Sequence, residues 1–75
     1  MNSETITLSR TLRKKQAARS RIIQKAEKLL RAGPIETVTI QDITDAADVG
    51  HGTFYLHFKS KHEVLIPIIQ TIAER

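Results

Sequence analysis

The 75-residue chain contains no cysteine and no tryptophan, and it has only three aromatic residues. The lack of cysteine excludes a disulfide framework, a thiolate metal site and a thiol nucleophile, and it suits a cytoplasmic protein. The longest apolar run, Val64 to Ile69, is six residues long and contains Pro67, whereas a membrane-spanning helix needs ~20. A chain this short forms one domain with a small core, which argues against a deep, enclosed active site.

The basic residues are concentrated in one segment. Residues 10–31 contain nine of the twelve Lys and Arg residues and one acid, Glu27, whereas residues 32–75 contain three basic and six acidic residues. The net charge of +4 therefore divides into a strongly basic front and a mildly acidic body. Such a distribution attracts polyanions, either nucleic acid or an anionic membrane surface; the alternative is a solvated face that only keeps the protein soluble.

Hydrophobic periodicity begins only after about residue 18. The preceding residues are polar or basic and aperiodic, so we predict a basic flexible arm over residues 1–18. Helical periodicity then continues to Leu30, and Gly33 and Pro34 stop this helix, with glycine in the C′ position. The apolar residues on its packing face are Ile22, Ile23, Ala26, Leu29 and Leu30.

A second helix is predicted over residues 39–47. Thr39 is a good N-cap, and Asp42 follows three residues later, as in a capping box. Val38 and Ile43 are spaced to form a hydrophobic staple across this N-terminus. The local signals for the start of this helix therefore agree with one another.

A tight turn and a third helix follow. Residues 48–50, Asp-Val-Gly, predict a turn in which Asp or Gly takes a positive φ, and the next helix is expected over residues 51–58. Two short helices joined in this way indicate a helix-turn-helix, in which the first helix braces the second and the second enters the major groove of DNA.

A fourth helix is predicted from Ser60 towards the C-terminus, with Ser60 and Glu63 as a second capping box. Pro67 would lie in its second turn, so we expect the helix to kink or restart there. Its apolar residues cover an arc of about 200°, although a one-sided surface helix needs only ~100°. The excess apolar surface indicates a missing partner surface or self-association. Its outer stripe comprises Ile66, Ile69 and Ala73.

No group of residues predicts a metal site or a catalytic centre. The three histidines are spaced six and five residues apart, so no two share a helical face at i, i+4. The three aspartates between residues 42 and 48 lack the intervening oxygen ligands of a calcium loop. Gly50 and Gly52 have neither the third glycine nor the preceding strand of a dinucleotide-binding loop. We therefore expect no metal, no cofactor and no enzymatic activity.

The pattern G-T-F-Y-x-H-F-x-S-K at residues 52–61, preceded by a Thr-led helix from residue 39, resembles the N-terminal DNA-binding domain of TetR-type transcriptional regulators. The resemblance covers roughly residues 19–75. It implies an all-α, homeodomain-like bundle of three helices with a helix-turn-helix over residues 19–58. Residues 59–75 would be the start of a fourth, connecting helix towards an absent C-terminal domain that binds a small-molecule effector and forms a homodimer.

The resemblance also implies which residues contact DNA. Positions at the start of the second and third helices correspond to those that reach bases: Gln41, His51, Gly52 and Thr53. Positions with hydroxyl, imidazole or ammonium groups correspond to those that hold phosphates: Thr39, Thr53, Tyr55, His57 and Lys61. An amide suits adenine, because it can pair bidentately. The chain departs from the family pattern in the turn, where Asp48 replaces the usual Gly and Gly50 replaces the usual Ser.

We predict that the chain binds duplex DNA sequence-specifically as half of a dimer on a palindromic operator and, by resemblance, regulates transcription, most often by repression. The alternative is a basic amphipathic module that binds a membrane surface or a protein partner. That alternative lacks the Trp or Phe that interfacial helices usually carry. In the DNA-binding interpretation, the cations of the basic arm neutralise phosphates. They are Arg13, Lys14, Lys15 and Arg19.

Overall fold

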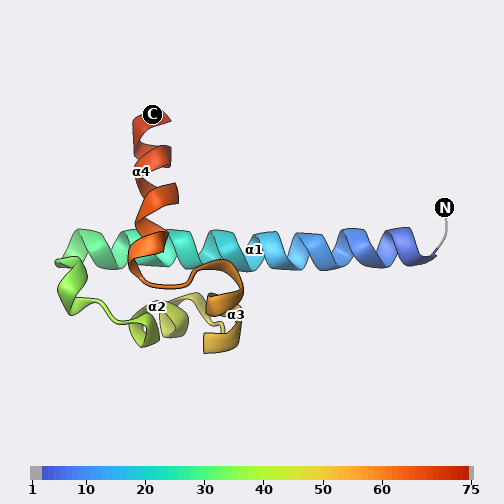
Figure 1. The fold of residues 1–75 in the computed structure, drawn as a ribbon, viewed down its shortest axis with the longest axis horizontal. Helices are drawn as coiled ribbons and strands as arrows, with labels where there is room; N and C mark the ends of the chain where they lie inside the picture. The colour runs from blue at the N-terminus through green and yellow to red at the C-terminus, as the bar shows by residue number, and fades with distance from the viewer. Residues whose placement is uncertain (1–2, 75) are drawn as a thin grey trace.

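The computed structural model describes the backbone of residues 3–74 and the side chains of residues 10–74, and over these residues every regular element is helical. The elements in chain order are α1 (Ser3–Ala32), η1 (Ile35–Thr37), α2 (Ile40–Ala47), α3 (His51–His57), η2 (His62–Val64) and α4 (Leu65–Glu74). Figure 1 shows α2 and α3 on one side of the long α1, and α4 rising from its other side. The predicted all-α helix-turn-helix bundle with a fourth helix is confirmed.

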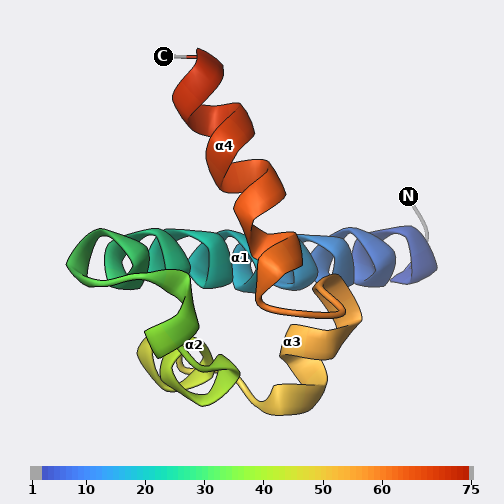
Figure 2. The same ribbon diagram turned by 60° about the vertical axis from the view of Figure 1, so that its left-hand side comes forward.

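Helix α1 is longer than predicted. We expected a helix from about residue 19, but the backbone is helical from Ser3, and the N-terminal half extends beyond α2 and α3 in both views (Figures 1 and 2). Residues 10–18 are mostly good helix formers, and Gly33 is the first residue of the chain that disfavours a helix strongly. The apolar periodicity starts near Ala18 because the helix begins to pack there. Residues 1–2 of the predicted arm lie outside the described residues.

The start of α2 has the predicted capping box. The backbone N–H of Asp42 donates to Thr39 Oγ1 at 3.0 Å, and the backbone N–H of Thr39 donates to Asp42 Oδ2 at 3.0 Å. These two bonds satisfy donors that a helix N-terminus otherwise leaves unpaired. The staple residues Val38 and Ile43 are both buried in the core.

The turn between α2 and α3 depends on Asp48. This residue has φ 55° and ψ 51°, the left-handed conformation, and it ends α2 as the C-cap. Gly50, the other candidate for a positive φ, has φ −82° and serves as the N-cap of α3. Helix α3 then runs over His51–His57, one residue shorter than predicted, and Phe58 is its C-cap.

The core lies where α2, α3 and the start of α4 meet the C-terminal half of α1. Ile22 of α1 and Phe54 of α3 are fully buried, and Ile43 of α2 is almost so. Burial of a side chain of this size contributes ~1.5–3 kcal/mol, so these few residues hold the short helices in place. The other members of the cluster are Ala26, Val38, Ala47, Phe58, Val64 and Ile68.

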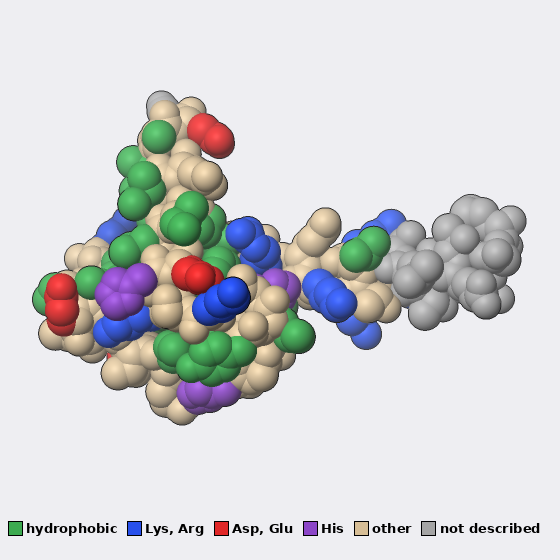
Figure 3. Space-filling model, viewed as in Figure 1, with side chains coloured by type: hydrophobic (Ala, Val, Ile, Leu, Met, Phe, Trp, Pro, Cys, Tyr) green, Lys and Arg blue, Asp and Glu red, His purple; other side chains and the backbone are tan. Residues whose placement is uncertain are grey.

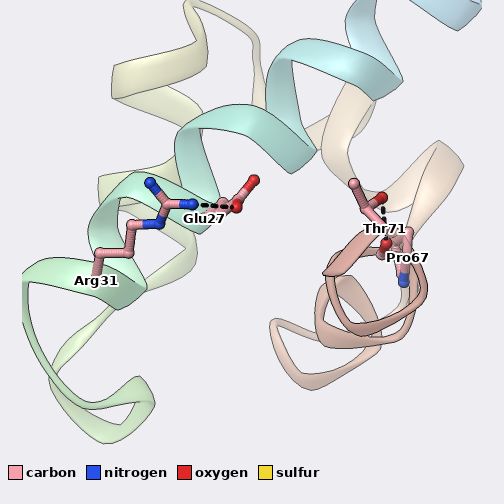
Figure 4. A network of polar contacts seen from close by, with 4 residues as sticks. All are labelled: Glu27, Arg31, Pro67 and Thr71. Atoms are coloured by element: carbon pink, nitrogen blue, oxygen red, sulfur yellow. Dashed lines mark hydrogen bonds and ion pairs between the residues drawn. The ribbon is translucent and has the colours of Figure 1, made fainter. Parts of the chain in front are cut away.

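Helix α4 does not begin at Ser60 as predicted. The 3₁₀ turn η2 comes first, and α-helical geometry starts at Leu65. Pro67 therefore lies in the first turn of α4, where its missing N–H has no intrahelical partner to lose. The predicted interruption at Pro67 is therefore wrong: α4 continues through Pro67 from Leu65 to Glu74, and the change of helix type lies two residues before the proline. Figure 4 shows that the Pro67 carbonyl accepts a hydrogen bond from Thr71 Oγ1 at 2.8 Å.

The outer face of α4 is apolar and exposed. Ile66, Ile69 and Ile72 are 58%, 60% and 55% exposed, whereas Ile68 on the opposite face is buried. Figure 3 shows hydrophobic side chains along α4 where it stands away from the body. The predicted exposure of Ile66 and Ile69 is confirmed.

Lys61 joins the loop after α3 to the segment before α2. Its Nζ donates to the backbone carbonyls of Ile35 at 2.9 Å and Val38 at 2.8 Å. Both bonds span more than twenty residues of sequence, so a single ammonium group sets the position of η1 relative to the end of α3.

We expect Lys61→Met to lower the free energy of unfolding by about 1 to 3 kcal/mol, because the methionine keeps the aliphatic stem but removes the ammonium donor from the Val38 carbonyl and leaves the Ile35 carbonyl with only the backbone N–H of Val38. Lys59→Met is the matched control, since the hydrogen bond of Lys59 to Glu63 comes from its backbone N–H and survives the substitution. Urea denaturation of both variants measures the difference. Equal stability of the two would show that the ammonium does not hold η1.

Candidate nucleic-acid interface

The helix-turn-helix presents two rows of exposed polar residues. Helices α2 and α3 lie together on one side of α1 (Figure 2), and the buried faces of both point towards it. With Ile43 and Phe54 turned inward, the start of α2 and the outer face of α3 are left to solvent. Every residue predicted to contact bases lies on these two surfaces.

At the start of α2, both predicted site residues are exposed and already hydrogen-bonded. Thr39 accepts from the backbone of Asp42, so its own O–H is not used in that bond and can donate to a further acceptor. The Gln41 side chain donates from Nε2 to Asp45 Oδ1 at 2.6 Å, one helical turn later.

On α3, His51 and Gly52 are exposed at the N-terminus, and Thr53 is half-buried. Tyr55 is 52% exposed, and its ring meets that of Phe54 edge-on at 5.5 Å between centroids. This contact orients the Tyr55 ring while its hydroxyl side stays accessible. No atom lies within 4 Å of a Cβ built on Gly52, so the fold itself does not require glycine there.

A basic cleft separates α3 from the N-terminal half of α1. Its volume is about 420 Å³. The cleft is lined by two lysines of the predicted arm, Lys14 and Lys15, and by two predicted phosphate contacts of α3, Thr53 and His57. The fold thus brings the arm and α3 together, although nearly forty residues separate them in sequence. The other residues that line the cleft are Ala18, Arg21, Asp48, Val49, Gly50 and Leu56.

The remaining cations of the basic segment differ in their surroundings. The Arg19 guanidinium lies over the Phe58 ring at 5.2 Å from its centroid, which is cation–π distance. Arg21 Nε donates to the Ala47 carbonyl at 3.2 Å and so caps the C-terminus of α2. Arg13 is exposed on the N-terminal half of α1 and does not line the cleft. Glu27 pairs with Arg31 at 2.8 Å on the far end of α1 (Figure 4).

His57 lies at the wall of this cleft and is half-buried. Its pKa is lowered from the ordinary value of 6.5, first by desolvation and then by the positive charges of Arg19 and Lys15. The imidazole is therefore held towards its neutral form. A phosphate bound in the cleft would offset the repulsion that Arg19 and Lys15 exert on a protonated His57. It would therefore raise the pKa of His57 and favour the protonated form.

Lys61, like Thr39 in its capping box, is a predicted phosphate contact that also has a structural role. Two of its three N–H groups reach the carbonyls of Ile35 and Val38, which leaves one donor for any ligand. Sequence reasoning missed this role, because neither carbonyl belongs to an element that the sequence pattern predicted.

Three further residues of this surface were not predicted. Leu56 on α3 is 74% exposed and lines the cleft together with its cationic side chains. Asp45 bonds Gln41, and Arg21 caps α2. The i, i+4 spacing from Gln41 to Asp45 could have indicated the first contact, whereas the contact of Arg21 depends on how α1 and α2 pack.

Among the residues that the structure describes, no cluster of three or more His, Cys, Asp or Glu side chains could hold a metal ion. In the same part of the chain, no helix combines the length and the apolar character needed to cross a bilayer.

Comparison with known proteins gives consistent matches. The sequence profile of the family described as bacterial regulatory proteins, tetR family, matches residues 22–67, more than half of the chain. The chain is 37% identical over 62 residues to the HTH-type transcriptional regulator TcmR of Streptomyces glaucescens, a region that covers 83% of this chain and 27% of TcmR. No solved structure matches the chain significantly.

Two other relatives agree with this match. The chain is 30% identical over 54 residues to the HTH-type transcriptional regulator EthR of Mycobacterium tuberculosis, covering 72% of this chain and 25% of EthR. It is 31% identical over 65 residues to the HTH-type transcriptional regulator TtgR of Pseudomonas putida, covering 87% of this chain and 31% of TtgR. The chain thus spans about a quarter to a third of the length of these curated relatives.

The lowered pKa of His57 makes the stability of the fold depend on pH. Just below pH 6.5 the unfolded chain binds a proton that the folded chain resists, so the free energy of unfolding falls as the pH drops through this range. We expect His57→Gln to lose less stability than the parent chain between about pH 7.5 and about pH 5.5. Urea titrations at both pH values measure this, and equal losses would contradict it.

Proposed function

The chain belongs to the tetR family of bacterial regulatory proteins, and we propose that it is the DNA-reading part of a transcriptional regulator, which binds duplex DNA sequence-specifically. TetR-family regulators are DNA-binding transcriptional regulators, and the relatives compared above are named as such. The observation that carries the proposal is the helix-turn-helix whose exposed polar face on α3 adjoins a cleft lined by Lys14, Lys15 and His57. Helices of this kind dock in the major groove with their N-terminal residues at base edges.

In the proposed complex, α2 and α3 divide the contacts between bases and backbone. Gln41, His51, Gly52 and Thr53 reach base edges from the two exposed helix N-termini. The open space around Gly52 then admits the DNA closely, because no side chain stands between the helix backbone and the groove. The exposed apolar side chain of Leu56 suits a thymine methyl group or a deoxyribose.

The phosphate contacts flank these base contacts. Thr39 and Tyr55 offer hydroxyl donors, and Thr53 and His57 line the basic cleft. Lys61 offers its remaining N–H, so its main contribution is to fix η1 and thereby the entry to α2. Contacts of this kind set the register of a protein on DNA without reading its sequence.

The basic segment would add attraction along the backbone. Lys14 and Lys15 face the cleft beside α3, and Arg13 extends the positive charge along the projecting helix. Arg19 adds its charge from its position over Phe58. In this proposal residues 1–18 remain a distinct basic arm, in helical form from Ser3.

The proposal extends to a larger regulatory assembly, of which these 75 residues would be the DNA-reading part. We propose that residues 19–58 read DNA and that residues 59–75 lead to a C-terminal domain that binds an effector and forms the homodimer. The exposed isoleucines of α4 support this, because such a stripe needs a covering surface. A dimer would read a palindromic operator, would act as a repressor by occupying it, and would do so where the DNA is, in the cytoplasm.

Selection of binding sites from duplexes with a randomised segment tests the proposal. We expect the 75-residue chain to enrich a short motif, and the same chain fused to an unrelated dimeriser to enrich two inverted copies and bind them about 10² to 10⁴ times more tightly. Absence of any enriched motif with either protein would refute sequence-specific binding.

Substitutions on α2 and α3 should separate base contacts from phosphate contacts. Gln41→Ala should reduce discrimination at one base pair by roughly 5- to 100-fold, the range for a bidentate contact. Tyr55→Phe keeps the ring contact with Phe54 and should weaken binding to selected and random duplexes equally. Competition titrations measure both effects. An unchanged preferred sequence with Gln41→Ala would remove Gln41 from the base contacts.

Neutralising the arm should change the salt dependence of binding. With Lys14→Gln and Lys15→Gln combined, the slope of log affinity against log salt should flatten by about 0.9 for each phosphate that the protein no longer neutralises. The matched control combines Lys25→Gln and Lys28→Gln, which remove the same charge from the part of α1 that does not line the cleft. If the two double variants have the same slope, the cleft does not hold phosphates.

A further inference from the structure

Among the described residues, one polar side-chain pair lies within the proposed base-reading surface, and it joins Gln41 to Asp45. Both side chains are exposed, and they lie one turn apart on α2 with Nε2 and Oδ1 at 2.6 Å. The neighbouring carboxylate of Asp42 has a clear structural role in the capping box of Thr39. The backbone carbonyl of Asp45 accepts the C-cap N–H of Asp48, but its carboxylate has no such role at a helix terminus and instead bonds the amide that we place at a base edge.

We propose that Asp45 is a positioning residue that sets the orientation of the Gln41 amide for base recognition. The inference rests on the proposed function of Gln41. A carboxylate can only accept hydrogen bonds, so it selects the amide orientation in which the nitrogen faces it and the oxygen points away. At i, i+4 on a helix such a pair forms without distortion of the backbone.

This orientation determines what Gln41 offers to DNA. With one N–H held by Asp45, the amide still presents one N–H donor and the Oε1 acceptor. An acceptor and a donor side by side match the N6 amino group and the N7 atom of adenine. Because Asp45 fixes their order along the amide edge, adenine on one strand is favoured over adenine on the opposite strand. Asp45 thereby contributes to discrimination between A·T and T·A without touching a base.

The same carboxylate is expected to weaken binding overall. A negative charge at a surface that faces phosphates repels every duplex, whatever its sequence. Asp45 should therefore have two effects of opposite sign: lower affinity for all DNA and higher selectivity at one base pair. A side chain with a merely structural role would not produce this combination.

The experiment compares four single variants of the 75-residue chain, and the double variant of Asp45→Ala with Gln41→Ala, on duplexes taken from the binding-site selection. Asp45→Ala removes the acceptor, and Asp45→Asn keeps the shape while allowing the Gln41 amide to bond in either orientation. Glu36→Gln removes one negative charge from an exposed position on η1 and controls for net charge. Gln41→Ala identifies the base pair that Gln41 reads. Circular dichroism verifies that each variant keeps the helical content of the parent.

At the base pair identified by Gln41→Ala, we expect Asp45→Ala to reduce the preference for the selected pair over its reversed pair by about twofold or more, as for removal of a helical Gln–Asp bond that also orients its partner. Asp45→Asn should have an intermediate effect. Both Asp45 variants should bind random duplex more tightly than the parent chain. When Asp45→Ala is combined with Gln41→Ala, the loss of preference should be smaller than the sum of the losses in the two single variants.

Undiminished preference in both Asp45 variants, or an equal change at every base pair, would overturn the positioning role while the proposed DNA-binding function stands. The same holds if Glu36→Gln lowers the preference as much as Asp45→Ala does. If Gln41→Ala changes no base preference, Gln41 is not a reader and the inference fails with that assignment. If the parent chain selects no sequence at all, the proposed function itself is wrong.

Discussion

The packing of Phe54 against α1 is the contact on which the rest of the structure depends. Helices of eight and seven residues, such as α2 and α3, are too short to be stable alone in water. They persist because Phe54 and Ile43 are buried against Ile22 of a helix long enough to hold both. The buried ring also fixes the rotation of α3, so that His51, Gly52 and Tyr55 are exposed.

The sequence predicted best where a local signal decides the conformation. The capping box of Thr39 and the left-handed turn at residues 48–50 depend on side chains next to the backbone that they serve, and both are present. The predicted start of α1 was wrong, because apolar periodicity marks where a helix packs and does not mark where it ends. The predicted start of α4 was wrong because Ser60 is followed by a 3₁₀ turn.

The candidate site shows the same division between local and long-range information. The exposure of Gln41 and His51 follows from their helix positions, and the sequence placed them correctly on the surface. It could not show that Lys14 and Lys15 share a cleft with His57, or that Lys61 bonds two carbonyls, because these contacts arise only after distant segments pack. The charge pattern of the sequence cannot distinguish these lysines, although Lys14 and Lys15 line a cleft and Lys61 bonds two backbone carbonyls.

In the proposed dimer, the length of α1 would restrict how two such domains share one operator. The molecule measures 48 × 29 × 18 Å, with α1 along its longest dimension (Figure 1), whereas half-sites of a palindrome are often spaced about 34–36 Å apart. Two copies at that spacing with their long axes parallel to the duplex would collide if their N-termini pointed towards the dyad. In that proposed dimer the arms would have to point outward along the flanking DNA, or α1 would have to cross the duplex at an angle. The length of α1 would therefore limit the possible arrangements of the two copies.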